Sequence, residues 1–362
     1  GARDAAPPFP PRGGAAASGL LLRPPRAALA RGDDACARIS IHQAAGRPVI
    51  WRAHARARES MDIQFFIELF FGGLTRGSIY ALIALGYTLV YGIIELINFA
   101  HGEIYMLGAF TALLVAGVLG VYGFPAAGIL IIAALAAVIW CAAYGFTLEK
   151  VAYKPLRGAP RLSPLISAIG MSIFLQNYVL LAQTSDFVPF PRLLPEMEFL
   201  EYVNYVMGPS DFLILLVSTL AMVALSLFIR FTRMGKAMRA TAQNRKMALL
   251  LGINADWIIS LTFIIGSGLA ALGGVLIASH MGQVNFGIGF LAGLKAFTAA
   301  VLGGIGSIPG AMVGGLVLGL AESFTTGYFS GNYEDILAFG ILILILIFRP
   351  DGILGKAKVQ KV

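Results

Sequence analysis

Residues 78–120 read SIYALIALGYTLVYGIIELINFAHGEIYMLGAFTALLVAGVLG, two apolar runs interrupted at 97–103 by INFAHGE. Each run is close to the roughly 20 apolar residues that a helix needs to cross a bilayer. The interruption nevertheless carries three polar side chains, Asn98, His101 and Glu103. Because polar groups at membrane depth need partners or a cavity, these residues are candidates to line or gate a path. The alternative is that they finish helix ends at the interface, with Asn98 capping the next helix and His101 hydrogen-bonding the loop.

The composition of the whole chain agrees with membrane-spanning helices. Hydrophobic residues make up 58% of the 362 residues and charged residues only 13%, whereas about 25% of a soluble domain is charged. The chain is therefore a membrane protein. Its two cysteines, Cys36 and Cys141, have no Cys or His neighbours at metal-ligand spacing. We expect neither a disulfide framework nor a metal site.

Counting by helix length predicts an all-α polytopic integral membrane protein with about eight transmembrane helices. The clear candidate spans are 77–94, 102–120, 124–146, 162–183, 211–231, 257–280 and 337–348. The Gly-rich stretch 293–324 is long enough to cross and return, which predicts a re-entrant or paired-helix element. Segment 63–75, with Glu68 inside it and Arg76 after it, is either a further short span or an interfacial helix.

The charged residues predict the orientation, because Lys and Arg of short loops stay on the cytoplasmic side. Three basic regions are therefore placed inside: 147–161, 230–256 and the tail after Arg349. Two acidic regions are placed outside: 184–210 and 331–335. Counting back, the connection 95–101 lies on the cytoplasmic side. The side of the N-terminus stays open, because it depends on whether 63–75 crosses.

The first 60 residues do not share this pattern. They hold 10 Arg, no Lys and 7 of the 17 Pro, without an apolar period. The first methionine is Met61, and the apolar sequence begins directly after it. We expect 1–60 to be a non-native or disordered N-terminal extension, either translated upstream sequence or a cloning artefact, with 61–362 as the membrane domain. An organellar transit peptide is the alternative, because such peptides are Arg-rich.

Glycines recur at steps of four in the Gly-rich stretch. They are Gly306, Gly310, Gly314, Gly315 and Gly319. This spacing places hydrogens where side chains would hold helices apart, so the glycines are predicted to pack helices closely, with gating as the alternative. Pro309, with Gly304 and Gly306, favours a break near the cytoplasmic side. Lys295 and Glu322 flank the element and can pair across it or simply anchor helix ends.

Two amides stand in another candidate span. Gln176 and Asn177 lie in SIFLQNYVLL at 172–181, deeper by count than the INFAHGE residues. We expect them to face a translocation path. Interhelical hydrogen bonding is an equally good explanation.

The basic segment 232–254, TRMGKAMRATAQNRKMALLLGIN, contains strong helix formers. It predicts a helix outside the membrane from Gly235 to Leu251, ended by Gly252. Such a helix would expose three apolar side chains, Met238, Met247 and Leu250. Exposed apolar residues on a basic cytoplasmic helix favour a protein partner. The alternative is a positive-inside loop without a partner.

Motifs for soluble chemistry are absent from the sequence. The two Gly-Lys pairs, at 235–236 and 355–356, are followed by Ala and lack the earlier Gly of a Walker A loop, so this chain should not bind ATP itself. Its four histidines are scattered, and neither HExxH nor CxxC occurs. We expect no enzyme activity, no bound cofactor and no nucleic-acid partner.

Several separated stretches resemble one known family over nearly all of 61–362. They are GSIYALIALGYTLVYGIIELINFAHGE, VAYKPLR, LISAIGMSIFLQNY, RMGKAMRA followed by KMALLLGIN, and KAFTAAVLGGIGSIPGAMVGGLVLGLAE. They are similar to the permease subunits of ABC importers for branched-chain amino acids, the LivH type. The resemblance implies a multi-pass subunit of the bacterial inner membrane, paired with a homologous second permease. It further implies two cytoplasmic ATP-binding subunits and a periplasmic binding protein that delivers leucine, isoleucine or valine.

The resemblance also places the coupling loop to the ATPase. In ABC importers this loop typically reads E-A-A-x-x-x-G, and the equivalent positions are Lys246, Met247, Ala248 and Gly252. Only Ala248 and Gly252 match that pattern. The place agrees with the basic cytoplasmic helix that the residues alone predict.

Other functions remain compatible with the residues alone. A related permease for urea, short amides or another small solute would have a similar composition, since most selectivity of such importers rests with the binding protein. An ion-coupled secondary transporter would show two repeated halves with broken helices, and no such repeat is visible. A channel or a purely structural subunit would act without ATP. Dependence of uptake on a partner ATPase separates these classes.

Overall fold

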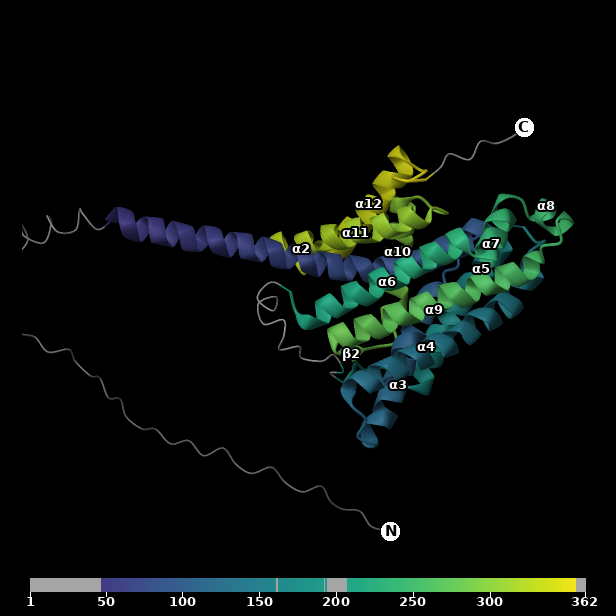
Figure 1. The fold of residues 1–362 in the computed structure, drawn as a ribbon, viewed down its shortest axis with the longest axis horizontal. Coiled ribbons are helices and arrows are strands. Elements are labelled where there is room, and N and C mark those ends of the chain that lie inside the picture. Colours follow the sequence, from purple (N-terminus) through teal and green to yellow (C-terminus); the bar gives the residue numbers. More distant parts are fainter. Residues whose placement is uncertain (1–46, 161, 192, 194–206, 356–362) are drawn as a thin grey trace, which may run out of the picture. The chain divides into compact units, whose positions relative to one another are not determined.

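The structure is a computed structural model that describes residues 47–160, 162–191, 193 and 207–355 (Figure 1). By its contacts the chain divides into Gly1–Glu59 and Ser60–Val362. In the first unit the described residues, from Arg47 on, are helical, and the expectations about residues 1–46 fall outside the described residues. The second unit is a helical bundle.

Eight helical segments of the described residues are long and apolar enough to cross a membrane, which confirms the all-α polytopic architecture. The α-helices are α2 (Arg47–Ile94), α3 (His101–Val121), α4 (Ala126–Leu148), α5 (Leu162–Ala182), α6 (Pro209–Phe231), α7 (Arg233–Gln243), α8 (Arg245–Leu250), α9 (Ala255–Met281), α10 (Ile288–Gly303), α11 (Ile308–Tyr328) and α12 (Glu334–Phe348). The short elements are the π-helical η1 (Glu149–Tyr153), the 3-10 turns η2 (Lys154–Leu156) and η4 (Gly331–Tyr333), and the two-residue strands β1 (Val188–Pro189) and β2 (Gln283–Val284), which pair antiparallel.

Segment 63–75 is neither a separate span nor an interfacial helix. It is continuous with 77–94 in α2, one helix whose candidate span is Ile63–Ile94. The glycines in the middle do not break this helix, because α11 packs against them: a Cβ on Gly73 would meet Leu320, and a Cβ on Gly77 would meet Leu316. The span is about 48 Å long at 1.5 Å per residue, well beyond the hydrocarbon thickness of about 30 Å.

The Gly-rich stretch forms the expected paired-helix element. α10 has 16 residues, about 24 Å of helix, which is less than a full span. It is followed by the turn 304–307 and by α11, and Pro309 stands in the first turn of α11, where a proline is tolerated. Figure 1 shows α10 and α11 beside α2.

Four of the five singled-out glycines lie at close helix contacts. A Cβ on Gly310 or Gly314 would collide with the backbone of α10, and one on Gly315 or Gly319 would collide with the backbone of α2. α11 therefore presents two glycine faces to two neighbours. The fifth, Gly306, does not pack helices: a Cβ there would meet nothing within 4 Å, and its φ of +92° belongs to the turn.

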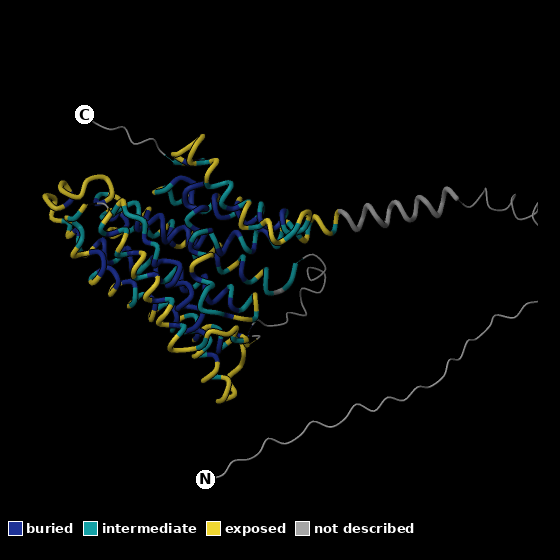
Figure 2. Tube along the Cα trace, turned by 180° about the vertical axis from the view of Figure 1, so that it is seen from behind, coloured by how far each residue is buried: buried dark blue, intermediate teal, exposed yellow. Residues whose placement is uncertain are grey.

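Small residues allow close packing between other helices of the bundle as well. On α9, Ala271 lies against Gly108 of α3 and Ser267 lies against Gly145 of α4. Buried residues run through the interior of the bundle, and exposed ones lie on its outer faces and ends (Figure 2). The core therefore forms where α3, α4 and α9 meet α2 and the α10–α11 pair.

Candidate functional site

The INFAHGE segment lies deep inside the bundle. Chain direction reverses after α2, and α3 begins at His101, whose ring lies against Gly86 of α2 and Gly266 of α9. Gly86 is eight residues before the end of α2, and Gly266 is eleven residues after the start of α9, so the ring lies about 12–16 Å along these helices. α3 therefore starts inside the bundle, away from the ends of α2 and α9.

Asn98 does not cap α3. The residue at the N-cap position is Ala100, and no side chain caps this helix end. The Asn98 carbonyl oxygen Oδ1 instead accepts a hydrogen bond of 2.8 Å from the hydroxyl of Tyr153, and both residues are buried. The prediction that Asn98 caps α3 is therefore wrong. The segment folds back into the bundle, where the Asn98 side chain accepts its hydrogen bond from η1.

His101 is buried between helices. Its ring hydrogen-bonds the backbone of Ile83 in α2 and lies 4.8 Å from the ring of Tyr87, edge to face. Its Nε2 atom has no hydrogen-bond partner among the described residues. His101 is therefore hydrogen-bonded to the backbone of α2 and not, as one prediction had it, to the loop before α3.

Glu103 joins α3 to two further elements. Its Oε1 atom accepts a hydrogen bond of 3.0 Å from the hydroxyl of Ser172 on α5. Its Oε2 atom has no hydrogen-bond partner among the described residues and points at Gly289, in the first turn of α10. A carboxylate at a helix N-terminus is stabilised by the helix dipole. Glu103 is thus a fully buried acid at the junction of α3, α5 and α10.

Tyr153, Tyr87 and Ser172 complete this buried polar cluster, and the sequence analysis did not single them out. Each lies in or near a stretch that carries the family resemblance, but an isolated hydroxyl among apolar residues gives no signal of its own. Their roles follow only from the fold, which brings α2, η1 and α5 to the start of α3.

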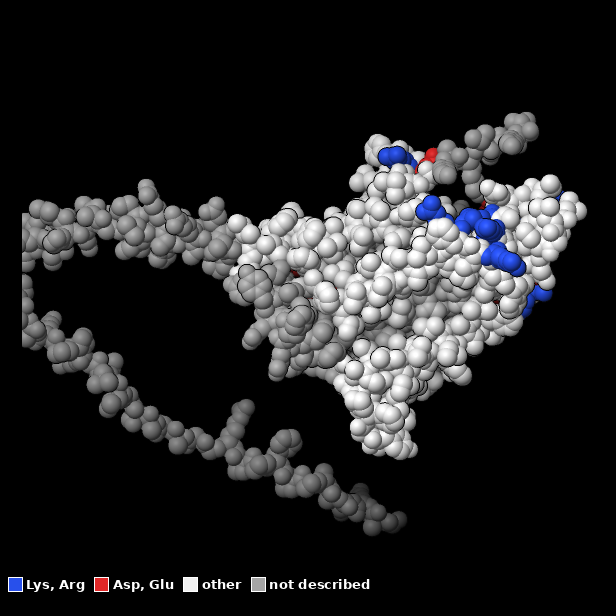
Figure 3. Space-filling view, in the orientation of Figure 1, with Lys and Arg blue, Asp and Glu red and all other residues white. Residues whose placement is uncertain are grey.

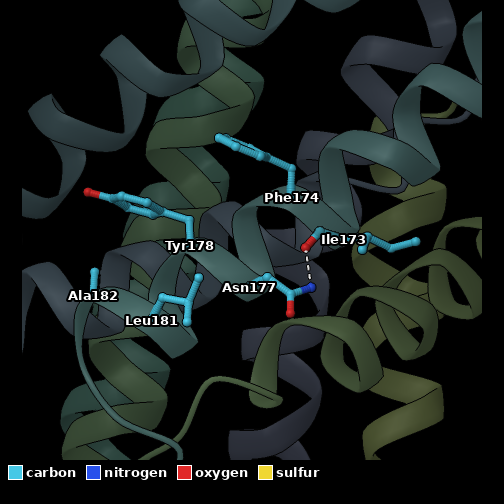
Figure 4. A pocket seen from close by; sticks show the side chains of 6 residues that line it. All are labelled: Ile173, Phe174, Asn177, Tyr178, Leu181 and Ala182. Carbon is cyan, nitrogen blue, oxygen red and sulfur yellow. Dashed lines mark hydrogen bonds between the residues drawn. The ribbon is translucent and has the colours of Figure 1, made fainter.

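Gln176 and Asn177 do not reach this cluster. Asn177 is exposed, and its Nδ2 atom donates a 2.8 Å hydrogen bond back to the Ile173 carbonyl of its own helix (Figure 4). It lines a hollow on α5 together with apolar side chains such as Phe174 and Tyr178. Gln176 is half-buried. That these two amides face a translocation path stays a prediction.

The basic segment 232–254 contains two helices outside the apolar spans, α7 and α8, and not one. α7 and α8 are separated by Asn244, which is extended (φ −158°, ψ 105°), and its Oδ1 atom accepts a 3.1 Å hydrogen bond from the Met247 amide at the start of α8. Asn is a strong capping residue, so it ends one helix and begins the next. Met238 is also not exposed, because α7 turns it into the bundle.

α8 and the residues after it present an exposed apolar surface at the basic end. The α8 surface consists of four residues: Met247, Leu249, Leu250 and Leu251. Leu250 is 81% exposed. Lys and Arg side chains gather around this end of the molecule (Figure 3). They include Arg233, Lys236, Arg245 and Lys246, which are all exposed.

The four expected coupling positions divide between two environments. Lys246 and Met247 are exposed, whereas Ala248 is buried against the bundle. Gly252 ends the segment with a φ of +78°, a conformation that suits glycine. The Gly252 amide donates a hydrogen bond to the Leu249 carbonyl, and the Ile253 amide donates one to the Ala248 carbonyl, as in a helix C-cap.

A cavity of about 590 Å³ lies between the end of α2, α6, α7 and the α10–α11 turn. Thr88, Met238 and Arg239 are among its lining residues. The Thr88 hydroxyl is buried without a hydrogen-bond partner among the described residues. A volume of this size, mostly apolar with a few polar groups, is typical of small-molecule sites. No group of His, Cys, Asp and Glu residues in the described part of the chain is arranged to hold a metal ion.

Comparison with known proteins gives one consistent family. A family model described as "Branched-chain amino acid transport system / permease component" matches residues 69–346. The chain is 53% identical over 312 residues to the permease protein BraD of Pseudomonas aeruginosa, a high-affinity branched-chain amino acid transport protein, covering 83% of this chain and 99% of BraD.

Two relatives from Escherichia coli extend this result. The permease protein LivH of the high-affinity branched-chain amino acid transport system is 50% identical over 314 residues, covering 84% of this chain and all of LivH (100%). The permease protein LivM of the same kind of system is 29% identical over 169 residues, covering 45% of this chain and 39% of LivM. The match of the family model and the identity over whole relatives show that this multi-pass membrane protein belongs to the family of branched-chain amino acid transport permease components.

Proposed function

We propose that this chain is the permease subunit of a bacterial inner-membrane ABC importer and that it carries leucine, isoleucine and valine inward. The observation that carries the proposal is the identity of about half of all residues to whole branched-chain amino acid permeases. The chain itself acts as a transport subunit and not as an enzyme. It binds no cofactor, and ATP hydrolysis takes place on partner subunits.

The buried polar cluster supports a path for a zwitterion with an apolar side chain. Such a solute needs polar contacts within the membrane for its amino and carboxyl groups. Glu103, His101 and Asn98 supply buried polar groups among apolar helices. On the cytoplasmic side, the cavity between α2 and α7 is large enough for a free amino acid on its way out.

The α8 surface supports docking of the ATPase. Four exposed apolar side chains on a basic cytoplasmic element are costly in water unless a partner covers them. They lie in the same segment as the expected coupling positions Lys246, Met247, Ala248 and Gly252, and Met247 belongs to both sets. Two ATP-binding subunits would serve this permease and a homologous second permease of the LivM kind. A periplasmic amino-acid-binding protein would deliver the solute to the opposite end.

The test is affinity purification of the tagged chain from its native membrane in mild detergent. The proposal expects two further kinds of subunit in the complex, a second permease and an ATPase, and ATP hydrolysis that rises when the leucine-loaded binding protein is added. A chain that purifies without an ATPase, yet transports leucine on an ion gradient, would refute it.

A further inference from the structure

Polar contacts and the backbone of one short helix connect Arg245, the first residue of α8, with the INFAHGE segment. We propose that the π-helical segment η1, Glu149–Tyr153, transmits movement of the docked ATPase to the buried start of α3. Arg157 and Tyr153 act as positioning residues at its two ends. This inference rests on the proposed function, since it concerns how that importer couples ATP hydrolysis to transport.

The first contact joins α8 to the neighbouring helix. Arg245, the first residue of α8, places its Nη2 atom 2.9 Å from Oδ1 of Asp256 in the first turn of α9. The same Asp256 oxygen lies 2.6 Å from Nη1 of Arg157. Asp256 therefore bridges Arg245, at the start of α8, and Arg157, which follows η2.

The second contact carries this bridge into the interior. Arg157 uses its other nitrogen, Nη2, to pair with Glu149, the first residue of η1. Glu149 is fully buried (0% exposed), and its Oε2 atom also accepts a 2.7 Å hydrogen bond from the Ser260 hydroxyl of α9. A buried carboxylate is strongly destabilised when its partner is removed, so Arg157 and Glu149 are expected to stay together when α8 moves.

The third contact is at the other end of η1. Tyr153, its last residue, donates the 2.8 Å hydrogen bond to Asn98 in INFAHGE. The Tyr153 ring is also held by Phe263 of α9, with ring centroids 5.2 Å apart. One short segment therefore holds an ion pair to Arg157, which reaches α8 through Asp256, and a hydrogen bond to the break between α2 and α3.

The geometry of these residues suits transmission better than simple anchoring. The planar guanidinium of Arg157 bridges two carboxylates in fixed directions, Glu149 inside and Asp256 outside, which the single ammonium of a lysine does not reproduce. π-helical turns are rare and occur frequently at functional sites. Energetic coupling between distant sites is carried by packed side chains and by networks of hydrogen bonds and salt bridges, such as those described here.

The test compares the two positioning residues with matched controls in the assembled importer. Tyr153→Phe removes one hydroxyl and keeps the ring. Arg157→Lys keeps the positive charge and removes the guanidinium group that contacts two carboxylates. The controls are Tyr122→Phe and Arg349→Lys, at exposed positions at the ends of α3 and α12. Each complex is reconstituted with its ATPase subunits, and leucine taken up per ATP hydrolysed is measured.

We expect both variants to lower this ratio about tenfold, as loss of a buried polar contact allows, while the ATPase subunits still co-purify in wild-type proportion. Both controls should keep the wild-type ratio. An unchanged ratio in Tyr153→Phe and Arg157→Lys would overturn the inference. Loss of the ATPase subunits from these variants would overturn it too, because the two residues would then be needed only for docking. Absence of ATP-dependent uptake by the wild-type complex would instead refute the proposed function itself.

Discussion

Lys295 on α10 and Glu322 on α11 form an ion pair inside the bundle, with 3.3 Å between Nζ and Oε1. Lys295 is 6% exposed and Glu322 is 0% exposed. The pair does not stand alone: Lys295 also lies 2.6 Å from Glu334 and 2.9 Å from Asp335 on α12, and Glu322 accepts a 2.8 Å hydrogen bond from Tyr80 on α2. These contacts join the paired-helix element to α2 and α12.

We predict that Lys295→Met destabilises the protein strongly. The substitution leaves Glu322 buried without its cation, which costs about 3–5 kcal/mol when one partner of a buried pair is removed. The thermal unfolding midpoint of the purified protein in detergent should fall. Adding Glu322→Gln should recover part of the loss, because the uncompensated charge is removed as well. A single variant as stable as the wild type would show that the pair does not hold the helices.

We predict that Gly319→Ala lowers the yield of folded protein. A Cβ at this position would collide with the backbone of Gly77, so α11 and α2 would have to separate. The control is Gly340→Ala on α12, where a Cβ would meet nothing within 4 Å. That change should be neutral or stabilise its helix by up to about 1 kcal/mol. Size-exclusion profiles and unfolding midpoints of the two variants check this, and equal behaviour would contradict the packing role of Gly319.

We predict that Gly252→Val abolishes uptake while the protein remains inserted. Space is not the reason, because a Cβ there would meet nothing within 4 Å, but the φ of +78° strains a β-branched residue. The end of α8 would then change direction. Asn tolerates this conformation better than other residues, so Gly252→Asn should retain most of the uptake. Uptake at equal membrane expression is measured, and normal uptake by the Val variant would count against the coupling assignment.

We predict that Leu250→Asp releases the ATPase subunits from the complex. Leu250 is the most exposed side chain of the α8 surface, and a charge there opposes apolar docking. Leu250→Met keeps an apolar side chain and should preserve the complex. The measurement is the amount of ATPase that co-purifies with each variant. If the Asp variant co-purifies as much ATPase as the wild type, the ATPase does not dock on the α8 surface.

Much of the fold was predictable from the sequence because span length is a property of local composition. The apolar runs of α3, α5, α6 and α9 predict these helices to within two residues at each end. The break before Pro309 was also predictable from its glycines and proline. Continuity of α2 was not, because Gly73 and Gly77 are tolerated only through packing against α11, a helix more than 200 residues later.

The candidate site was predictable only in part, since depth is set by tertiary structure. INFAHGE was identified by its polar residues, but the sequence does not indicate that the chain folds back to place His101 against Gly86 and Gly266. Tyr153 and Ser172 gave no signal because their partners are distant in the sequence. Asn244 as a cap between two helices was missed because its neighbours are all good helix formers.

Leucine uptake into proteoliposomes that contain the chain with its co-purified subunits distinguishes an ATP-driven importer from an ion-coupled transporter. We predict uptake that depends on the leucine-binding protein, requires hydrolysable ATP at the face where α8 lies, persists without an ion gradient, and stops when ATP is replaced by a non-hydrolysable analogue. Uptake driven by a proton or sodium gradient in the absence of ATP would contradict it.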